Sequence, residues 1–279
     1  MTFALRDQVA VVTGAASGIG AALAEVLAAR GCHLALADVN ARGLADVAAR
    51  ASAAGVRVST HALDVADARA VAAFPATVVA EHGRVSVLVN NAGVALAGRF
   101  EQVSLADFEW LFGVNFWGVV RMTHAFLPPL RRAPAAHIVN LSSLFGIVAP
   151  PGQVAYAASK FAVRGFSESL RHELAGSGIG LTVVHPGGVR TAIATNARRT
   201  GLSNAEVAAD ARRWDKLLRL DPMIAADHIA RGIERQQPRV LIGRDARRMA
   251  LIQRLFPVRY WRVVQRLSGA AGRRPVPRG

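Results

Sequence analysis

The stretch Thr13-Gly14-Ala15-Ala16-Ser17-Gly18-Ile19-Gly20 places three glycines between an apolar run, Gln8–Val12, and a helical pattern, Ile19–Arg30. Glycines at such a turn let the backbone bend tightly and approach a pyrophosphate, whose charge the N-terminus of the helix stabilises. By itself a glycine-rich turn is weak support, and a plain turn is the alternative interpretation. Its position between a strand and a helix favours a dinucleotide-binding unit, with Gly14, Ser17, Gly18 and Gly20 at the cofactor.

Outward from this turn, short apolar runs alternate with alanine-rich helical stretches. The predicted strands are Gln8–Val12, His33–Ala37, Val56–Leu63, Val85–Val89, His137–Leu141, Leu181–His185 and Arg239–Gly243. The predicted helices include Ile19–Arg30, Ala41–Ala54 and one from Pro222 to about Gln236, capped by Asp221. Apolar strands separated by crossover helices indicate a parallel sheet covered on both faces. We therefore predict an α/β fold: a doubly wound, mostly parallel seven-stranded sheet of Rossmann type in a three-layer α/β/α arrangement.

The composition fits a single domain over residues 1–279. The chain is 52% hydrophobic and 19% charged, and no linker or internal repeat divides it. It has no apolar run long enough to span a membrane and no secretion signal, so we expect a cytoplasmic protein. The single cysteine, Cys32, is expected to be a small buried residue. No metal-ligand spacing occurs among the histidines, so no catalytic metal is expected.

Asp38 ends the second predicted strand, at the distance from the glycine turn where a carboxylate can accept hydrogen bonds from both hydroxyls of an adenosine ribose. The same carboxylate repels a 2′-phosphate by an energy on the order of several kcal/mol at an effective dielectric of about 20. Neither Ser17 nor Val39 supplies a compensating cation, although Arg42 lies close in sequence. NAD is therefore the expected cofactor and NADP the less favoured one. An ordinary turn residue is the alternative interpretation of Asp38.

With these features the chain resembles the short-chain dehydrogenase/reductase family, whose motifs recur in order over residues 6–243. The resemblance implies that Ile19 lies at the pyrophosphate, and Asp64 and Val65 at the adenine. In the segment Asn90-Asn91-Ala92-Gly93 it places Asn90 near the adenosine ribose and makes Asn91 partly structural. The later segment Pro186-Gly187-Gly188-Val189-Arg190-Thr191 resembles the family's Pro-Gly motif. There the Val189 backbone meets the nicotinamide carboxamide, and Thr191 reaches the carboxamide or the pyrophosphate.

Tyr156 and Lys160 are the central catalytic candidates, because a spacing of four residues places them on one helix face. Lowering a tyrosine pKa from about 10 to about 7 requires about 4 kcal/mol in favour of the phenolate. One ammonium at about 5 Å and an effective dielectric near 20 supplies about 3 kcal/mol, and an oxidised nicotinamide adds more. The pair, together with oxidised cofactor, therefore suffices for a general base. Both side chains are also expected to contact the cofactor.

Ser143 lies just beyond the fifth strand, where its hydroxyl can donate to a substrate oxygen. Ser142 is the competing candidate, and the serine-to-tyrosine spacing of the family favours Ser143. The resemblance matches Asn115 to an asparagine that holds a water between the lysine and solvent; a merely structural polar residue is the alternative. Ser143, Tyr156, Lys160 and Asn115 thus resemble a complete catalytic tetrad. In it the tyrosine takes the alcohol proton while hydride passes to NAD.

On the substrate side the resemblance places Leu96, Leu144, Phe145 and Gln153, which suggests an apolar substrate, although core packing explains each almost as well. Residues 191–220 lose clear periodicity and are expected to form a mobile substrate loop with short helical pieces. His185 is expected to be a packing residue at a strand end. The resemblance also implies a homodimer or homotetramer through helices around Val103–Leu130 and Tyr156–Leu174.

Positive charge is concentrated near the C-terminus. Residues 190–279 hold 20 Lys+Arg and 7 Asp+Glu, which is +13 of the total of +15. In the basic extension of residues 244–279, apolar residues recur among arginines as far as Leu267, and Pro257 is expected to split them into two helices. Arg273–Gly279 is expected to be a frayed tail. The extension either touches an anionic membrane peripherally or packs against another subunit. Without a DNA-reading motif, a nucleic-acid partner is not expected.

The sequence therefore predicts an NAD-dependent enzyme that interconverts a small-molecule secondary alcohol and a ketone. One alternative is an NADPH-dependent 3-oxoacyl carrier-protein ketoreductase, which Asp38 opposes. A second alternative is a non-catalytic, dinucleotide-sensing regulator, which has no need of the four catalytic residues.

Overall fold

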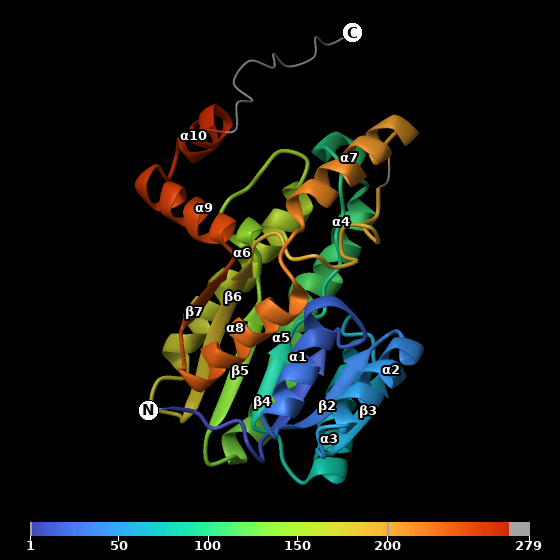
Figure 1. Ribbon diagram of the computed structural model, residues 1–279, viewed down its shortest axis with the longest axis vertical. Helices are drawn as coiled ribbons and strands as arrows, with labels where there is room; N and C mark the ends of the chain where they lie inside the picture. The colour runs from blue at the N-terminus through green and yellow to red at the C-terminus, as the bar shows by residue number, and fades with distance from the viewer. Residues whose placement is uncertain (1, 200, 268–279) are drawn as a thin grey trace.

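Seven strands form one sheet in the computed structural model, which describes residues 2–199 and 201–267 (Figure 1). The strands are β1 (Val9–Thr13), β2 (His33–Asp38), β3 (Val58–Ala62), β4 (Val87–Asn90), β5 (Ala136–Leu141), β6 (Ile179–Pro186) and β7 (Arg239–Ile242). Their order is β3-β2-β1-β4-β5-β6-β7, and each neighbouring pair is parallel. The order reverses between β1 and β4, the point where doubly wound sheets bind ligands. The predicted Rossmann-type sheet is confirmed.

Helices cover both faces of this sheet, as the sequence predicts. They are α1 (Gly18–Ala29), α2 (Ala41–Ser52), α3 (Ala68–His82), α4 (Leu105–Phe112), α5 (Gly118–Arg132), α6 (Val154–Glu173), α7 (Asn204–Leu217), α8 (Pro222–Glu234), α9 (Arg244–Leu255) and α10 (Tyr260–Leu267). Three short turns join them: η1 (Phe100–Gln102), the π-helical η2 (Gly113–Trp117) and η3 (Leu144–Gly146). One apolar cluster takes side chains from α1, α2 and α8, and a second takes them from α3, α5 and α6.

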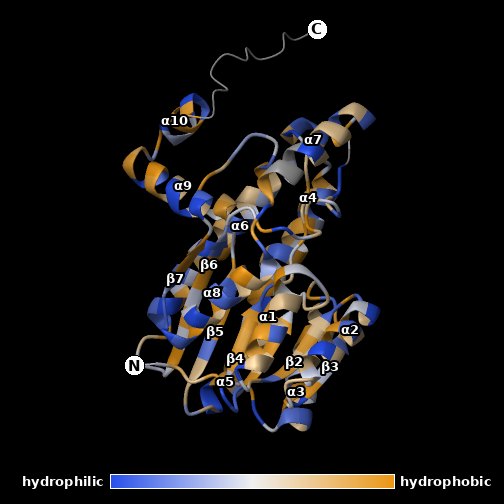
Figure 2. Cartoon of the chain, viewed as in Figure 1, coloured by the Kyte–Doolittle hydropathy of each residue, from blue (hydrophilic) through white to orange (hydrophobic). Residues whose placement is uncertain are grey.

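Successive strand residues alternate between these two clusters. In β1, Ala10 and Val12 belong to the first cluster and Val11 to the second, and all three are fully buried. Because both faces are covered, the central strand β1 is apolar at four successive positions rather than at every second one, whereas the edge strand β3 carries Ser59, Thr60 and His61. Figure 2 shows the central strands in orange. Cys32 is buried in the first cluster, as expected.

Several element ends follow from local signals. Asp221 Oδ1 accepts a hydrogen bond from Met223 N at 2.8 Å, and Pro222 opens α8. The break between α9 and α10 falls at Pro257, as predicted.

Between residues 2 and 267, apart from residue 200, no helix combines the length and apolar character needed to cross a membrane. The predicted tail, Arg273–Gly279, lies outside the described residues.

Residues 191–220 are more regular than predicted, because α7 is one helix of 14 residues rather than short helical pieces. A capping box begins it: Ser203 Oγ accepts from Glu206 N at 3.3 Å, and Glu206 Oε2 accepts from Ser203 N at 2.8 Å. Half of the α7 residues are polar and four of the others are alanines, so its hydrophobic periodicity is weak, and the Ser-x-x-Glu spacing was the signal that could have located it. The mobility of this segment stays a prediction.

Candidate active site

Close backbone contacts build the glycine turn between β1 and α1. Gly14 and Gly18 have φ angles of 63° and 56°, in the left-handed region that glycine tolerates. A Cβ on Gly20 would lie 2.1 Å from the Gly14 carbonyl oxygen and 2.5 Å from Asn91 Nδ2. Ser17 does not cap α1 with its side chain, so the first amides of the helix are available to an anion. The turn therefore fits the diphosphate of a dinucleotide.

Asp38 lies beside this turn at the carboxyl end of β2. Its Oδ2 accepts a hydrogen bond from Ala16 N at 3.0 Å, and its Oδ1 accepts one from Asn40 N at 2.9 Å. Each carboxylate oxygen can accept a second hydrogen bond. The carboxylate thus ties the glycine turn to β2 and still offers acceptors to a ribose. Farther along this edge, Asp64 is exposed and Val65 is buried against Gly118.

The two asparagines after β4 have different surroundings. Asn91 Nδ2 donates to the carbonyl oxygens of Thr13 and Gly14 at 2.9 Å each, which gives it the structural role expected of it. The side chain of Asn90 is turned into the core, where Nδ2 donates to Asn140 Oδ1 at 2.8 Å. Any ribose contact at this position is therefore left to the backbone. Ala92 and Gly93 follow directly at the strand end.

Three of the predicted catalytic residues meet where β5 ends and α6 begins. Tyr156 lies beside the side chain of Ser143, which lowers the pKa of the phenol. Lys160 is buried, with Nζ 5.7 Å from the centroid of the Tyr156 ring and donating to the Leu141 carbonyl at 3.1 Å. The competing Ser142 is also buried, and its hydroxyl donates to the Lys160 carbonyl at 2.9 Å. The structure therefore brings Ser143, rather than Ser142, to the tyrosine.

Asn115 lies in the π-helical turn η2 and is fully buried. Its Oδ1 accepts from Val94 N at 2.8 Å, and its Nδ2 donates to the Val94 carbonyl at 3.0 Å and to Ser159 Oγ at 3.2 Å. A Cβ placed on Gly93 would be 3.3 Å from Asn115 Oδ1 and 3.4 Å from Lys160 Nζ. Asn115 and Lys160 therefore flank the same small residue. Isolated π-helical turns within helices are frequent at functional sites.

Burial dominates the titration of the central pair. It raises the pKa of Tyr156 from 10.0 to about 12, against a smaller lowering by the hydrogen bond with Ser143. It lowers the pKa of Lys160 from 10.5 to about 8. Both shifts disfavour the charged form of the side chain. In the protein alone, burial therefore keeps the pKa of the Tyr156 phenol above its ordinary value.

Aromatic side chains flank the phenol on the predicted substrate side. The ring of Phe145 meets that of Tyr156 edge to face, with centroids 6.1 Å apart, and tilts against Trp214 of α7 at 6.0 Å. Leu144 is half-buried in the same turn, η3, and Gln153 is nearly buried just before α6. Leu96 instead lies inside a small apolar cluster with Leu111 and Ala155, 2% exposed. Sequence reasoning missed Trp214, because no motif links α7 to Ser143.

The Pro-Gly segment continues from β6 toward the glycine turn. Val189 is buried, and a methyl group of Thr191 would lie 3.0 Å from a Cβ placed on Gly18. Pro186 ends β6, Gly187 N donates to the Ile242 carbonyl at 2.9 Å, and half-buried Ile19 packs on the first core cluster. His185 is fully buried, with Nδ1 2.9 Å from the Ser143 carbonyl oxygen, so it packs at the strand end as expected.

Sequence reasoning also missed Asp245, in the first turn of α9. Its Oδ2 accepts a hydrogen bond from Gly188 N at 2.7 Å. A Cβ on Gly187 would lie 2.2 Å from both carboxylate oxygens. The basic extension therefore begins in contact with the segment expected to hold the nicotinamide. Its signal in the sequence is that Asp245 is the only acidic residue after Glu234.

Comparison with known proteins agrees with this geometry. Residues 8–201 match the family model described as short chain dehydrogenase. The chain is 44% identical over 262 residues to a putative oxidoreductase, SadH, of Mycobacterium tuberculosis, covering 93% of this chain and 94% of that protein. It superposes on a short-chain dehydrogenase/reductase from Burkholderia phymatum in complex with NAD, with a TM-score of 0.85, 30% identity and 99% of each chain covered. A metagenomic short-chain oxidoreductase in complex with NADP gives a TM-score of 0.71 at 33% identity, covering 86% of this chain and 98% of that one.

Proposed function

The chain belongs to the short-chain dehydrogenase family, whose members are oxidoreductases acting on CH–OH groups, and from that premise we propose that it interconverts a secondary alcohol and a ketone with NAD. The observation that carries this proposal is the grouping of Ser143, Tyr156 and Lys160 where β5 ends and α6 begins, with Lys160 Nζ 5.7 Å from the centroid of the phenol ring. This group follows β5, two strands from the glycine turn after β1, at the same edge of the sheet.

Tyr156 is the group that moves the substrate proton in this proposal. Its phenol takes the proton from the alcohol hydroxyl, or returns one to the ketone oxygen, while the Ser143 hydroxyl donates to the same oxygen. Lys160 and Asn115, which flank Gly93, carry the proton onward toward solvent. NAD, when bound, supplies the hydride acceptor. The glycine turn, Asp38 and the Pro-Gly segment are the residues that would hold it.

Electrostatics set the conditions under which Tyr156 can act as a base. Burial raises the pKa of the phenol from 10.0 to about 12, which disfavours the phenolate by about 3 kcal/mol. A positive charge on Lys160 at 5.7 Å offsets about 3 kcal/mol at an effective dielectric near 20. The lysine therefore only balances the effect of burial. Oxidised NAD, when bound, would supply the further positive charge that brings the pKa of the phenol toward the neutral range.

The test of the catalytic assignment is Tyr156→Phe, for which the chain offers a matched control. Its other tyrosine, Tyr260, lies in the C-terminal extension, where the hydroxyl accepts a hydrogen bond from Ala149 N. We expect Tyr156→Phe to lower kcat at least a hundredfold with little change in NADH affinity, because it removes the proton but keeps the ring. Tyr260→Phe should retain activity. Steady-state assays on a panel of secondary alcohols with NAD measure both, and wild-type rates from Tyr156→Phe would refute the assignment.

The preference for NAD rests on Asp38 in this proposal. We expect Asp38→Asn to bind NADP at least tenfold more tightly than the wild type, because it removes the charge that repels a 2′-phosphate. The amide oxygen can keep one of the two backbone hydrogen bonds. Asp46→Asn, which removes one exposed charge from α2, is the control. Calorimetric titration with both cofactors measures the change, and equal NAD and NADP affinities in the wild type would contradict the preference.

An apolar substrate is the further part of the proposal, supported by the ring of Phe145, which contacts both Tyr156 and Trp214.

We also propose that the chain forms a homo-oligomer through α4, α5 and α6. Apolar side chains on this face are solvent-exposed in the single chain: Trp117 is 49% exposed, Val154 46% and Phe161 38%. Light scattering in solution measures the assembly, and a monomer would contradict it.

A further inference from the structure

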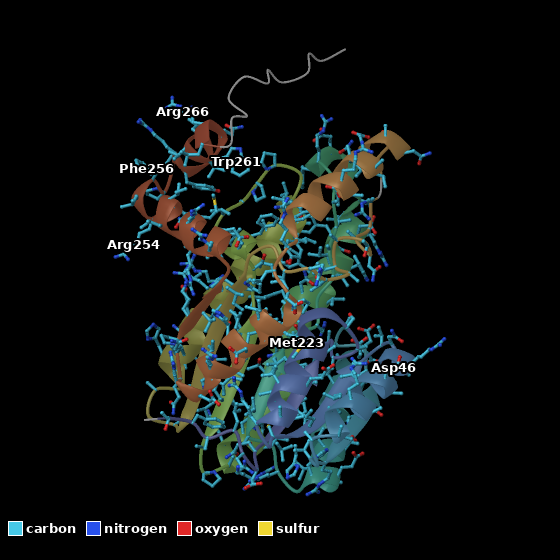
Figure 3. All side chains as sticks on the ribbon, in the orientation of Figure 1. Asp46, Met223, Arg254, Phe256, Trp261 and Arg266 are labelled. Atoms are coloured by element: carbon cyan, nitrogen blue, oxygen red, sulfur yellow. The ribbon has the colours of Figure 1, made fainter. Side chains whose placement is uncertain are left out.

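Helices α9 and α10 form an arm that is fixed to the body on its inner side. Ala246 is fully buried, and Asp245 is bonded to Gly188. The Tyr260 hydroxyl accepts from Ala149 N at 3.0 Å, and Trp261 lines an apolar hollow on α6 together with Val154 and Phe161. Figure 3 shows Trp261 on the inner side of the arm, and Arg254 and Phe256 at its outer margin. The outer face of the arm therefore has a defined orientation.

Exposed apolar side chains recur along the arm from α9 to the end of α10. Leu251 and Leu255, one helical turn apart in α9, are 56% and 62% exposed. The connection to α10 adds Phe256 at 46% and Val258 at 91%, and Leu267 ends α10 at 72%. Because they are exposed to water, these apolar side chains obtain no stabilisation from burial in the single chain, and such a patch is typical of a surface that contacts a partner or a membrane.

Exposed arginines lie among these apolar side chains. Residues 244–267 contain seven arginines and one acidic residue, Asp245, and so carry +6. The arginines are Arg244, Arg247, Arg248, Arg254, Arg259, Arg262 and Arg266, and all seven are exposed. Among the described side chains none of them forms a salt bridge with an acid, and Asp245 faces Gly188. The positive charge of the arm is therefore uncompensated.

We propose that this arm docks on the surface of an anionic lipid bilayer. Leucine, phenylalanine and valine side chains enter the boundary between headgroups and acyl chains, while arginines reach phosphate on either side. A second copy fits less well, because a two-fold interface through this face would bring +6 against +6 with no acid to pair. The proposal is independent of the proposed function, since docking needs no substrate or turnover.

Vesicle flotation of the full chain tests the proposal. We expect binding to vesicles of phosphatidylcholine with phosphatidylglycerol, no binding to phosphatidylcholine alone, and release at high salt. Arg247→Gln/Arg248→Gln should weaken binding about thirtyfold, since each arginine contributes roughly a fivefold factor. Leu255→Ser should weaken it as well. All three side chains are exposed, so unchanged circular dichroism and thermal midpoint are expected.

The matched control is Arg131→Gln/Arg132→Gln, which removes two exposed charges at the end of α5. These arginines lie near the amino ends of the strands, whereas the arm follows the carboxyl end of β7. This variant should bind vesicles like the wild type. Equal loss in both double variants, or no binding of the wild type to anionic vesicles, would overturn the proposal. Binding to poly-glutamate without binding to vesicles would assign the arm to an acidic protein instead. A change of oligomeric state in Arg247→Gln/Arg248→Gln alone would assign it to a subunit interface.

Discussion

Replacing Lys160 by Met is expected to abolish activity and yet make the protein more stable at neutral pH. Burial lowers the pKa of the Lys160 ammonium from 10.5 to about 8. At about 1.4 kcal/mol for each pH unit, the folded protein at pH 7 carries a charge whose burial costs about 3 kcal/mol. Methionine fills a similar volume without charge, but it loses the hydrogen bond to the Leu141 carbonyl, which is worth about 1 kcal/mol. The net gain at pH 7 is about 2 kcal/mol.

The sign of this effect depends on pH in a defined window. Between about pH 8 and 10.5 the unfolded wild type binds more protons at this lysine than the folded wild type does. Its stability relative to the variant therefore rises across that window. Above pH 10.5 the amine is neutral in both states, and the wild type should be the more stable protein by about 1 kcal/mol, because only it keeps the hydrogen bond.

Urea unfolding of the wild type and Lys160→Met at one protein concentration, from pH 7 to pH 11, measures the difference. All other titrating groups are common to both proteins, so the difference isolates Lys160. A stability difference that does not change with pH, or a variant less stable than the wild type at pH 7, would refute the reasoning. NAD-linked turnover should be lost at every pH, because Lys160 neighbours the proton-transferring phenol.

Two further substitutions test the cofactor side. Gly20→Ala is expected to cost about 2 kcal/mol of stability and to weaken NAD binding, because its Cβ would meet the Gly14 carbonyl oxygen. Thermal unfolding and calorimetric titration measure both effects, and a variant that matches the wild type in both would contradict the tight turn. Asp245→Ala is expected to raise the KM for NAD several-fold with a smaller change in kcat, since it frees Gly188 N. Asp245→Asn keeps an oxygen that can accept the hydrogen bond from Gly188 N, so its KM for NAD should return most of the way to the wild-type value. Equal KM values in the wild type, Asp245→Ala and Asp245→Asn would exclude a positioning role.

Much of the fold follows from signals between residues near one another in the chain. The glycine turn after β1, the apolar strands and the crossover helices determined a doubly wound parallel sheet, because a strand apolar at every position must be covered on both faces. Asp221 and Pro257 set helix ends for equally local reasons. Helix α7 was not predicted as one helix, because its strongest signal is the capping box and not its hydrophobic periodicity.

The sequence by itself determined which residue types follow the strand ends, the glycines, Asp38 and Ser143, and that Tyr156 and Lys160 share one helix face. Only the tertiary structure decided where their side chains point and how buried they are. It turned Asn90 into the core, brought Ser143 rather than Ser142 to the phenol, and seated Asp245 on the Pro-Gly segment. The physical reason is that orientation and desolvation arise from contacts between residues far apart in the chain, such as Asp245 and Gly188, which no local pattern records.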